Sequence, residues 1–508
     1  MADWNPTQGE LRPDSKLHII FAASETLPFQ KTGGLADVTA SLPKELAALG
    51  HRVEVFIPLY LKALLYPIDH GLRIRPAENF PVVKIRLGDY SYRSRIYSTR
   101  LPDGDVTFHL VDSDTYQYFT SRSALVSPYS FGDNFSRFAF FSKVVAKTCA
   151  LRADAKPDIV HAHDWPTGFV PLFLSTEYEY TKIATVFTIH NLGYSNDLLP
   201  ERFHALTRLK EVDHPGLYGW RERGLVHQGR VDMLKAGIVR ADMVNTVSPS
   251  YAQEIQEPEL GGAYSHTLRW IAERGQLTGI LNGLDTMWYP TLPPDRFVQH
   301  KQAAKQELQR AFSLPEDPGA FLVVMTSRLA QQKGYQLLPE TCGLLRSWGV
   351  RLQLVAAVDG EEDLRQQLLS CDSPEIVVRH LPYNEDLTRT LVYPGADCLL
   401  MPSLYEPCGL SQIIAQLNGA PPVVHATGGL RDTVEEGRTG FVFQPHRAGE
   451  FAAAVERAYR TFRTDPAGWR QLIGRVMALD YSWRHSARLY EDLYRQARRR
   501  ATSPERYA

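Results

Sequence analysis

Short apolar runs alternate with segments of helical spacing along most of this chain, and this alternation is what most constrains its fold. Residues 17–23 and 53–57 are apolar runs of strand length. Between them, leucine and valine residues from 35 to 49 recur at helical spacing, and Gly50 marks a helix end. The order strand, helix, strand predicts a βαβ unit with parallel strands and a right-handed crossover.

The same pattern recurs further along the chain. Apolar runs at 158–162 and 184–189 flank a predicted helix at 165–174. After a proline-rich break at 289–294, a second series of predicted strands occupies residues 321–325, 352–355, 375–378, 398–401 and 422–424. Two such series predict an α/β protein with two doubly wound, Rossmann-like domains that face one another across a deep cleft. We expect domains at 16–290 and 291–480, followed by a closing helix at 481–500.

Composition excludes several classes of protein. The 56 Lys and Arg residues nearly balance 57 Asp and Glu residues, so no net field favours nucleic acid or an anionic membrane. The five cysteines are scattered without a CxxC pair, which argues against a disulfide framework or a structural zinc site. The first 16 residues lack the apolar stretch of a signal peptide, and no apolar run is long enough to span a membrane. We therefore expect a cytoplasmic protein.

Residues able to do chemistry follow the strands of the first series. Lys31, Gly33 and Gly34 come just before a predicted helix, where paired glycines and free helix N–H groups allow close approach to phosphate or sugar oxygens. A plain strand-to-helix turn is the alternative interpretation. His163 and His190 follow two later strands, and their uncharged rings suit a hydroxyl-rich ligand.

Zinc is an alternative at these histidines. His161 and His163 lie on the same side of a strand and could supply two ligands, but no third ligand is evident from the spacing.

Polar residues follow the strands of the second series as well. Arg328 and Lys333 come after one strand, and two cations at the mouth of a parallel sheet can bind a diphosphate leaving group. Glu406 follows another strand and the Gly428–Gly429 pair follows the next. Because ligands bind beyond the carboxyl ends of parallel strands, these residues are candidates for one site. A simple salt bridge from Glu406 to one of the cations is the structural alternative.

Motifs along the chain resemble those of the bacterial glycogen synthase and plant starch synthase family, which is glycosyltransferase family 5 and has the GT-B fold. The resemblance covers nearly the whole chain after the first 16 residues. It rests on the motifs KTGGLAD (31–37), DNFSRF (133–138), HAHDW (161–165), TIHN (188–191), TVSPSYA (246–252), LNGLD (281–285), SRLAQQKG (327–334), EPCGLSQ (406–412) and TGGLRDTV (427–434).

The resemblance implies an enzyme that transfers glucose from ADP-glucose to the non-reducing end of an α-1,4-glucan such as glycogen or starch, with retention of configuration. It implies that 16–290 binds the glucan, that 291–480 binds the nucleotide sugar and that the closing helix packs back on the first domain. No cofactor and no metal are expected. Catalytic roles fall to Glu406, His163, Arg328 and Lys333. Donor or substrate contacts fall to Lys31, Gly33, Gly34, Asp37, His190, Asn191, Asn282, Cys408, Gly409, Leu410, Thr427, Gly428 and Gly429.

This sequence departs from the family pattern on the donor side. Val358 stands where the family has the first glycine of a GxG turn, and Leu404 stands where arginine is common. Ile414 replaces a usual tyrosine, and His425 belongs to a segment that is more basic in the family. The preference between ADP-glucose and UDP-glucose is therefore left open.

Three rival functions remain open, one of which is a related transferase that makes a different α-glucoside. A catalytically silent glucan-binding homologue would retain the fold without transfer. A metal-dependent transferase of the single-sheet type is suggested by Asp112 and Asp114, a DxD motif after a predicted strand.

Overall fold

The computed structural model describes residues 16–77, 80, 82–102, 104–113, 119, 127–152, 155–210, 217, 224–287, 289, 297–382, 384–504 and 506. Contacts divide the chain into two compact units. Unit 1 comprises Met1–Asn245, His266–Leu277 and Ala487–Ala508, and unit 2 comprises Thr246–Ser265 and Thr278–Ser486. The proline-rich segment expected to form a hinge at 289–294 lies outside the described residues except for Tyr289.

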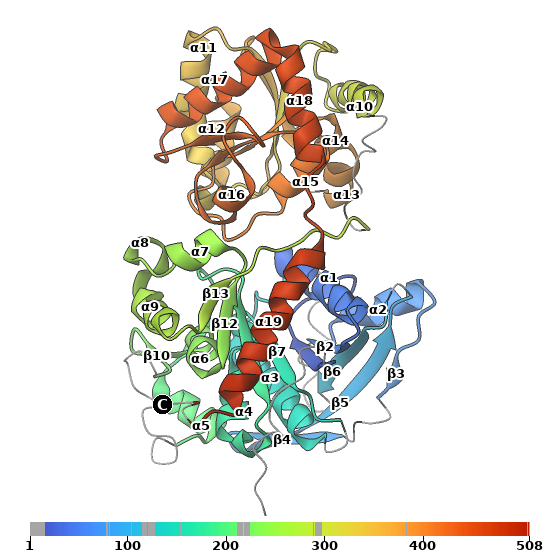
Figure 1. Cartoon of the computed structure of the whole chain (residues 1–508), viewed down its shortest axis with the longest axis vertical. Helices are drawn as coiled ribbons and strands as arrows, with labels where there is room; N and C mark the ends of the chain where they lie inside the picture. Colours follow the sequence, from blue (N-terminus) through green and yellow to red (C-terminus); the bar gives the residue numbers. More distant parts are fainter. Residues whose placement is uncertain are drawn as a thin grey trace, which may run out of the picture. The chain divides into compact units, whose positions relative to one another are not determined.

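The main sheet of the first part of the chain has the strand order β13-β12-β8-β7-β1-β2-β6-β5-β3, with β4 paired to β5 (Figure 1). Its strands are β1 (His18–Ala22), β2 (Arg52–Pro58), β3 (Arg75–Pro76), β4 (Val83–Leu87), β5 (Tyr90–Arg100), β6 (Thr107–Ser113), β7 (Ile159–His163), β8 (Ala184–Ile189), β12 (Met243–Thr246) and β13 (Leu277–Gly279). The strands from β8 to β6 in this order are parallel, and β5 turns the edge antiparallel. A small antiparallel sheet contains β9 (Asp197–Leu198), β10 (Val226–His227) and β11 (Arg230–Asp232).

The helices of this part are α1 (Gly34–Ala48), α2 (Leu61–Asp69), α3 (Asn134–Leu151), α4 (Phe169–Thr176), α5 (Pro200–Thr207), α6 (Met233–Arg240), α9 (Ser265–Glu273) and α19 (Trp483–Ala501). The helix predicted at 165–174 is in fact two segments, a 3₁₀ turn at Trp165–Thr167 and then α4. Gly168 joins them against the carbonyl of Met233, where an added Cβ would lie 1.9 Å from the oxygen. The backbone is redirected there because only glycine fits against that carbonyl.

Unit 2 contains a six-stranded parallel sheet in the order β16-β15-β14-β17-β18-β19. Its strands are β14 (Phe321–Met325), β15 (Leu352–Ala357), β16 (Ile376–Leu381), β17 (Cys398–Met401), β18 (Pro422–His425) and β19 (Phe441–Phe443). Its helices are α7 (Pro249–Glu254), α8 (Pro258–Gly261), α10 (Phe297–Ala311), α11 (Leu338–Ser347), α12 (Glu362–Leu369), α13 (Glu385–Leu387), α14 (Tyr393–Gly395), α15 (Ser411–Leu417), α16 (Gly428–Thr433), α17 (Ala448–Thr464) and α18 (Pro466–Met477).

Both faces of this second sheet are covered. Phe321 and Val323 belong to one buried apolar cluster, whereas Leu322 and Val324 belong to another. Successive strand residues point to opposite faces, so one strand contributes to two cores. Helices on both faces of a parallel sheet form the doubly wound α/β arrangement that the sequence predicts, and that prediction is confirmed.

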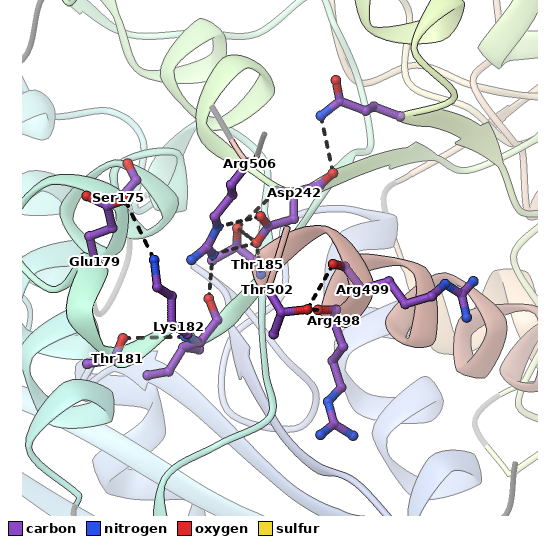
Figure 2. Close-up of polar contacts among 12 residues, drawn as sticks. Ser175, Glu179, Thr181, Lys182, Thr185, Asp242, Arg498, Arg499, Thr502 and Arg506 are labelled. Carbon is purple, nitrogen blue, oxygen red and sulfur yellow. Dashed lines mark hydrogen bonds and ion pairs between the residues drawn. The ribbon is translucent and has the colours of Figure 1, made fainter. Parts of the chain in front are cut away.

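The last segment of unit 1, residues 487–508, packs against the first segment of the same unit. In α19, the Tyr494 hydroxyl lies 3.0 Å from Nδ1 of His161. Further along, Arg506 pairs with the fully buried Asp242, with Nε and one terminal nitrogen each 2.7 Å from its oxygens. Figure 2 shows this pair beside Thr185, whose backbone N–H and hydroxyl also donate to Asp242. None of the helices in the described ranges is long and apolar enough to cross a bilayer.

Candidate active site

The glycine-containing loop that follows β1 leads directly into α1. Lys31 Nζ lies 3.0 Å from Asp37 Oδ1 in the first turn of the helix, which ties the loop to the helix that follows it. Gly33 and Gly34 are exposed, and an added Cβ on Gly33 would meet no atom within 4 Å. The loop therefore presents backbone on its open side, together with a partly buried lysine, as expected from the sequence.

A buried carboxylate that sequence analysis missed supports this loop from beneath. Glu25 is only 3% exposed and accepts hydrogen bonds from the backbone N–H and the hydroxyl of Thr32, the latter at 2.7 Å. The Tyr129 hydroxyl donates to the same carboxylate at 2.6 Å. Burial raises the pKa of Glu25, while the hydrogen bonds from Tyr129 and Thr32 oppose that increase. Glu25 thus positions the residues that precede Gly33.

Two histidines from neighbouring strand ends meet in unit 1. Nδ1 of His163 lies 3.0 Å from Nε2 of His190, so these two nitrogens share one hydrogen bond. Burial holds the pKa of both rings well below the ordinary value, to about 3 for His190, and both are neutral near pH 7. His163 is fully buried, and its Nε2 is one of the buried side-chain atoms without a hydrogen-bond partner. An unpaired nitrogen of this kind can donate to or accept from a hydroxyl group.

The zinc alternative finds little support in the geometry of His161. Its two ring nitrogens face hydroxyls, Tyr494 at 3.0 Å and Thr188 at 2.6 Å. In the part of the chain that the structure describes, no group of three or more His, Cys, Asp or Glu side chains is arranged to hold a metal ion.

Asp164 fixes the backbone next to these histidines. It has a left-handed φ of 56°, and its carboxylate accepts the N–H groups of His190, at 2.7 Å, and Asn191. Burial raises the pKa of Asp164 to about 7. Asn191 in turn accepts the Gly193 N–H at 2.9 Å through its side chain. The structure therefore brings His163, His190 and Asn191 together, and it does so through Asp164, a carboxylate that was not predicted.

In unit 2, the predicted lysine and glutamate form a close ion pair. Lys333 Nζ lies 2.6 Å from Glu406 Oε2, and the Ser403 hydroxyl donates to the same oxygen at 3.2 Å. Both side chains are largely buried, with 17% and 9% exposure. The salt bridge considered for Glu406 is therefore present, and it places a cation and a carboxylate beside each other. Arg328, from the same loop as Lys333, is exposed.

A tight turn holds Lys333 in place. Gly334 has φ of 79°, and a Cβ there would lie 1.9 Å from the carbonyl oxygen of Pro402. The backbone N–H of Leu404 donates to the carbonyl of Gln332 at 2.8 Å, which joins the loop after β14 to the loop after β17. This join requires glycine, because any side chain would separate the two loops.

The rest of the EPCGL segment is mostly internal. Cys408 is buried, burial raises its pKa to about 12, and the Asn282 backbone N–H donates to its sulfur. Gly409 has φ of 74°, with the Gln412 side chain where a Cβ would lie, and Leu410 precedes α15. Asn282 and Cys408 therefore meet, through backbone and sulfur, and a thiol of such high pKa is a poor nucleophile.

The backbone amides of the glycine pair in α16 have partners within the chain. The Gly428 N–H donates to both carboxylate oxygens of Glu254, at 3.0 and 2.9 Å, and the Thr427 hydroxyl lies 3.2 Å from the same group. The Gly429 N–H donates to the Glu406 carbonyl at 3.1 Å. Glu254 was not identified from the sequence. The Glu254 carboxylate thus accepts the N–H of Gly428, a residue that the resemblance assigns to donor or substrate contacts.

The donor-side departures occupy varied environments. Leu404 is 45% exposed, and Ile414 is buried in the apolar cluster that contains Leu322 and Val324. Val358 is partly buried and packs against the other cluster, which contains Phe321 and Val323. His425 Nδ1 contacts the Ser403 carbonyl at 2.9 Å. Of the DxD motif, Asp112 lies in β6, whereas Asp114 lies outside the described residues.

Comparisons with known proteins agree on one family. The family model described as starch synthase catalytic domain matches residues 18–270, and the model for glycosyl transferases group 1 matches 320–461. The chain is 38% identical over 504 residues to a glycogen synthase of Syntrophotalea carbinolica, covering 95% of this chain and 99% of the relative. It is 34% identical over 499 residues to a glycogen synthase of Bacillus cereus, covering 94% and 99%.

Among solved structures, the catalytic domain of starch synthase IV from Arabidopsis thaliana, bound to ADP and acarbose, superposes with a TM-score of 0.80 at 29% identity. The match covers 96% of this chain and 100% of that one. A sucrose-phosphate synthase from Thermosynechococcus elongatus, at 19% identity and a TM-score of 0.53, shares the fold alone.

Proposed function

Because the chain belongs to the glycogen and starch synthase family of glycosyltransferases, we propose that it transfers glucose from ADP-glucose to the non-reducing end of an α-1,4-glucan, with retention of configuration. Support for an adenine nucleotide and a glucan comes from the Arabidopsis relative, which was solved with ADP and acarbose. We propose a cytoplasmic location and a reaction without a bound cofactor.

The single observation that carries the mechanism is the ion pair between Lys333 and Glu406. In the proposed reaction, Lys333 and Arg328 neutralise the negative charge that develops on the departing nucleoside diphosphate. Glu406, 2.6 Å from the lysine, holds the ammonium group in position and accepts hydrogen bonds from hydroxyl groups of the donor sugar. A preformed cation lowers the barrier because its environment does not reorganise during the reaction.

The residues in unit 1 are proposed to bind the sugars. The buried, unpartnered Nε2 of His163 is suited to a hydroxyl of the transferred glucose, because a neutral imidazole pairs with a hydroxyl without a charge penalty. Lys31 and the open backbone at Gly33 and Gly34 are proposed to contact donor or acceptor. We assign 16–290 to glucan binding, 291–480 to the nucleotide sugar and 481–500 to a helix that packs back on the first domain.

The test is incorporation of labelled glucose into a glycogen primer, with ADP-glucose and UDP-glucose measured in parallel. We expect incorporation from ADP-glucose, and we expect Lys333→Ala and Glu406→Ala each to lower kcat by about 10²- to 10³-fold, the cost of removing one transition-state contact. Arg310 and Glu316 provide a matched control, since they form an ion pair of 3.2 Å on the surface of the same unit.

Arg310→Ala and Glu316→Ala should leave the rate unchanged, because exposed ion pairs contribute at most about 1 kcal/mol to stability. A wild-type protein that binds glycogen but transfers glucose from neither donor would overturn the proposal in favour of a silent glucan-binding homologue. Incorporation from UDP-glucose alone would overturn the assignment of the donor while leaving the reaction class intact.

A further inference from the structure

A cavity of about 890 Å³ opens in unit 1 against the strands β2, β6, β5 and β3. Its lining is rich in arginine. The lining residues are Arg52, Val53, Glu54, Arg73, Arg75, Pro76, Ala77, Phe80, Ser98, Thr99, Arg100, Asp105, Thr107, His109 and Arg152. This volume lies in the range of small-molecule sites, roughly 300–1,000 Å³. None of the residues assigned to transfer lines the cavity.

Strand register explains why these side chains meet. Thr107 is the partner of Glu54 on one side and of Arg100 on the other. Ser98, which lies two residues before Arg100 on β5, pairs with Arg75 on β3. Positions two apart on a strand share a face, so both rows line the same side of the sheet. Arg52 and Thr107 begin β2 and β6, so the cavity lies towards the amino ends of these parallel strands, whereas the candidate active-site residues follow the carboxyl ends.

The charges in the cavity leave an excess of cations. Glu54 is already paired, with Arg152 at 2.9 and 3.1 Å and with Arg52 at 2.8 Å. His109 also contacts Glu54, at 2.8 Å, and burial lowers the pKa of that histidine. Glu54 and its partners therefore form a rigid, internally satisfied base to the cavity.

Three further arginines line the cavity around that base. Within the described part of the chain, Arg73, Arg75 and Arg100 form no ion pair, and Asp105 is the only other carboxylate in the lining. Arg73 and Arg75 are exposed, and Arg100 has its Nε 3.0 Å from the Thr107 hydroxyl. Three guanidinium groups without carboxylate partners around one concave surface favour an anionic ligand.

We propose that this cavity is a second binding site and that it takes a phosphorylated sugar. Guanidinium groups pair with phosphate oxygens through two parallel hydrogen bonds, which Arg75 and Arg100 are placed to supply. The hydroxyls of Ser98 and Thr107 and the carboxylate of Asp105 can bind sugar hydroxyls. Phe80 offers an apolar surface beside them, with the Arg152 guanidinium 4.9 Å from its ring.

The experiment is isothermal titration calorimetry of the full-length protein with fructose 6-phosphate at low salt. This probe carries a phosphate and cannot donate a glucosyl group. Saturable binding is expected, with Kd raised about tenfold or more by the double variant Arg75→Gln/Arg100→Gln, since two charge-assisted contacts are lost. Arg93→Gln is the matched control, because Arg93 is an exposed arginine on the same strand that does not line the cavity. Its Kd should match the wild type.

Three results would overturn the proposal. They are no binding of fructose 6-phosphate to the wild type, equal Kd values for wild type and double variant, and binding of inorganic phosphate as tight as that of the sugar phosphate. A melting temperature of the double variant within a few degrees of the wild type verifies folding. If the double variant does not fold, the single variant Arg73→Gln replaces it, with a smaller increase in Kd expected. Glucose transfer is not measured, so the outcome does not depend on the proposed reaction.

Discussion

Asp164, which accepts the backbone N–H of His190, should make the stability of the protein depend on pH. Its pKa is raised by burial to about 7 from an ordinary value near 4, so the folded state retains a proton that the unfolded state releases in this range. The free energy of unfolding therefore falls as pH rises from about 4 to about 7, by at most about 4 kcal/mol from this group. Asp164→Asn preserves an oxygen that can accept the His190 N–H and removes the titration.

Scanning calorimetry at pH 5 and pH 8 measures this effect. We expect the melting temperature of the wild type to fall more between the two pH values than that of Asp164→Asn. Other groups that titrate are common to both proteins and cancel in the comparison. Equal changes in the two proteins would show that Asp164 is ionised throughout.

At this scale, the sequence identifies residues that belong to motifs and misses those that support them. Lys333 and Glu406 were predicted because each follows a strand, and the structure places them 2.6 Å apart. Glu25 and Glu254 were not predicted, although each binds a glycine-containing loop. A single glutamate has no signature in sequence, since its role depends on burial and on partners brought close by the fold.

At the scale of elements, the turn that carries Lys333 is held by a glycine. We predict that Gly334→Ala lowers kcat for glucose transfer at least tenfold, because the new Cβ displaces the loop from Pro402 and moves the adjacent lysine. Gly349→Ala is the control, with a similar φ of 73° and no atom within 4 Å of the added Cβ.

The control isolates the cost of a left-handed backbone, roughly 1–2 kcal/mol, from the clash. Melting temperatures and steady-state kinetics on both variants separate the two effects. The assignment fails if Gly334→Ala and Gly349→Ala lose stability equally and both retain full kcat.

Parallel strands were predicted best among the elements. The strands at 184–189, 321–325 and 398–401 were located at their observed bounds, because strands buried on both faces form continuous apolar runs. The antiparallel strands β4 and β5 were not identified. They alternate buried and exposed residues, so their apolar signal is half as dense and merges with ordinary surface sequence.

At the scale of the whole molecule, a buried ion pair between Arg506 and Asp242 links the last segment of unit 1 to the first. We predict that Arg506→Met destabilises the protein by about 3 kcal/mol or more, because it leaves the Asp242 carboxylate buried without its cation. Arg499→Met, an exposed arginine of α19, should change stability by about 0.5 kcal/mol or less.

The double variant Asp242→Asn/Arg506→Met completes a thermodynamic cycle measured by melting temperature. The loss of stability in the double variant should be smaller than the sum of the losses measured for Asp242→Asn and Arg506→Met separately. Strict additivity, or equal effects of Arg506→Met and Arg499→Met, would mean that the pair does not anchor the chain end.

Each of the two units is built from segments that are separated in the sequence. The contacts that join these segments are not encoded in any local sequence pattern. Ser250 donates to Asp432 within unit 2, although 182 positions separate them. Such pairs depend on the finished fold. Short-range periodicity therefore predicts the layers of each sheet but not which distant segments complete them.

Because unit 1 includes residues 487–508 as well as 1–245, it is completed only after unit 2 has been synthesised, although its first segment is made before unit 2. While unit 2 is being translated, α19 has not yet been made. Nδ1 of His161 therefore lacks the Tyr494 hydroxyl, which is its hydrogen-bond partner in the folded protein. Domains otherwise tend to fold in order of synthesis. Here the first segment of unit 1 stays incomplete until residues 487–508 have been translated.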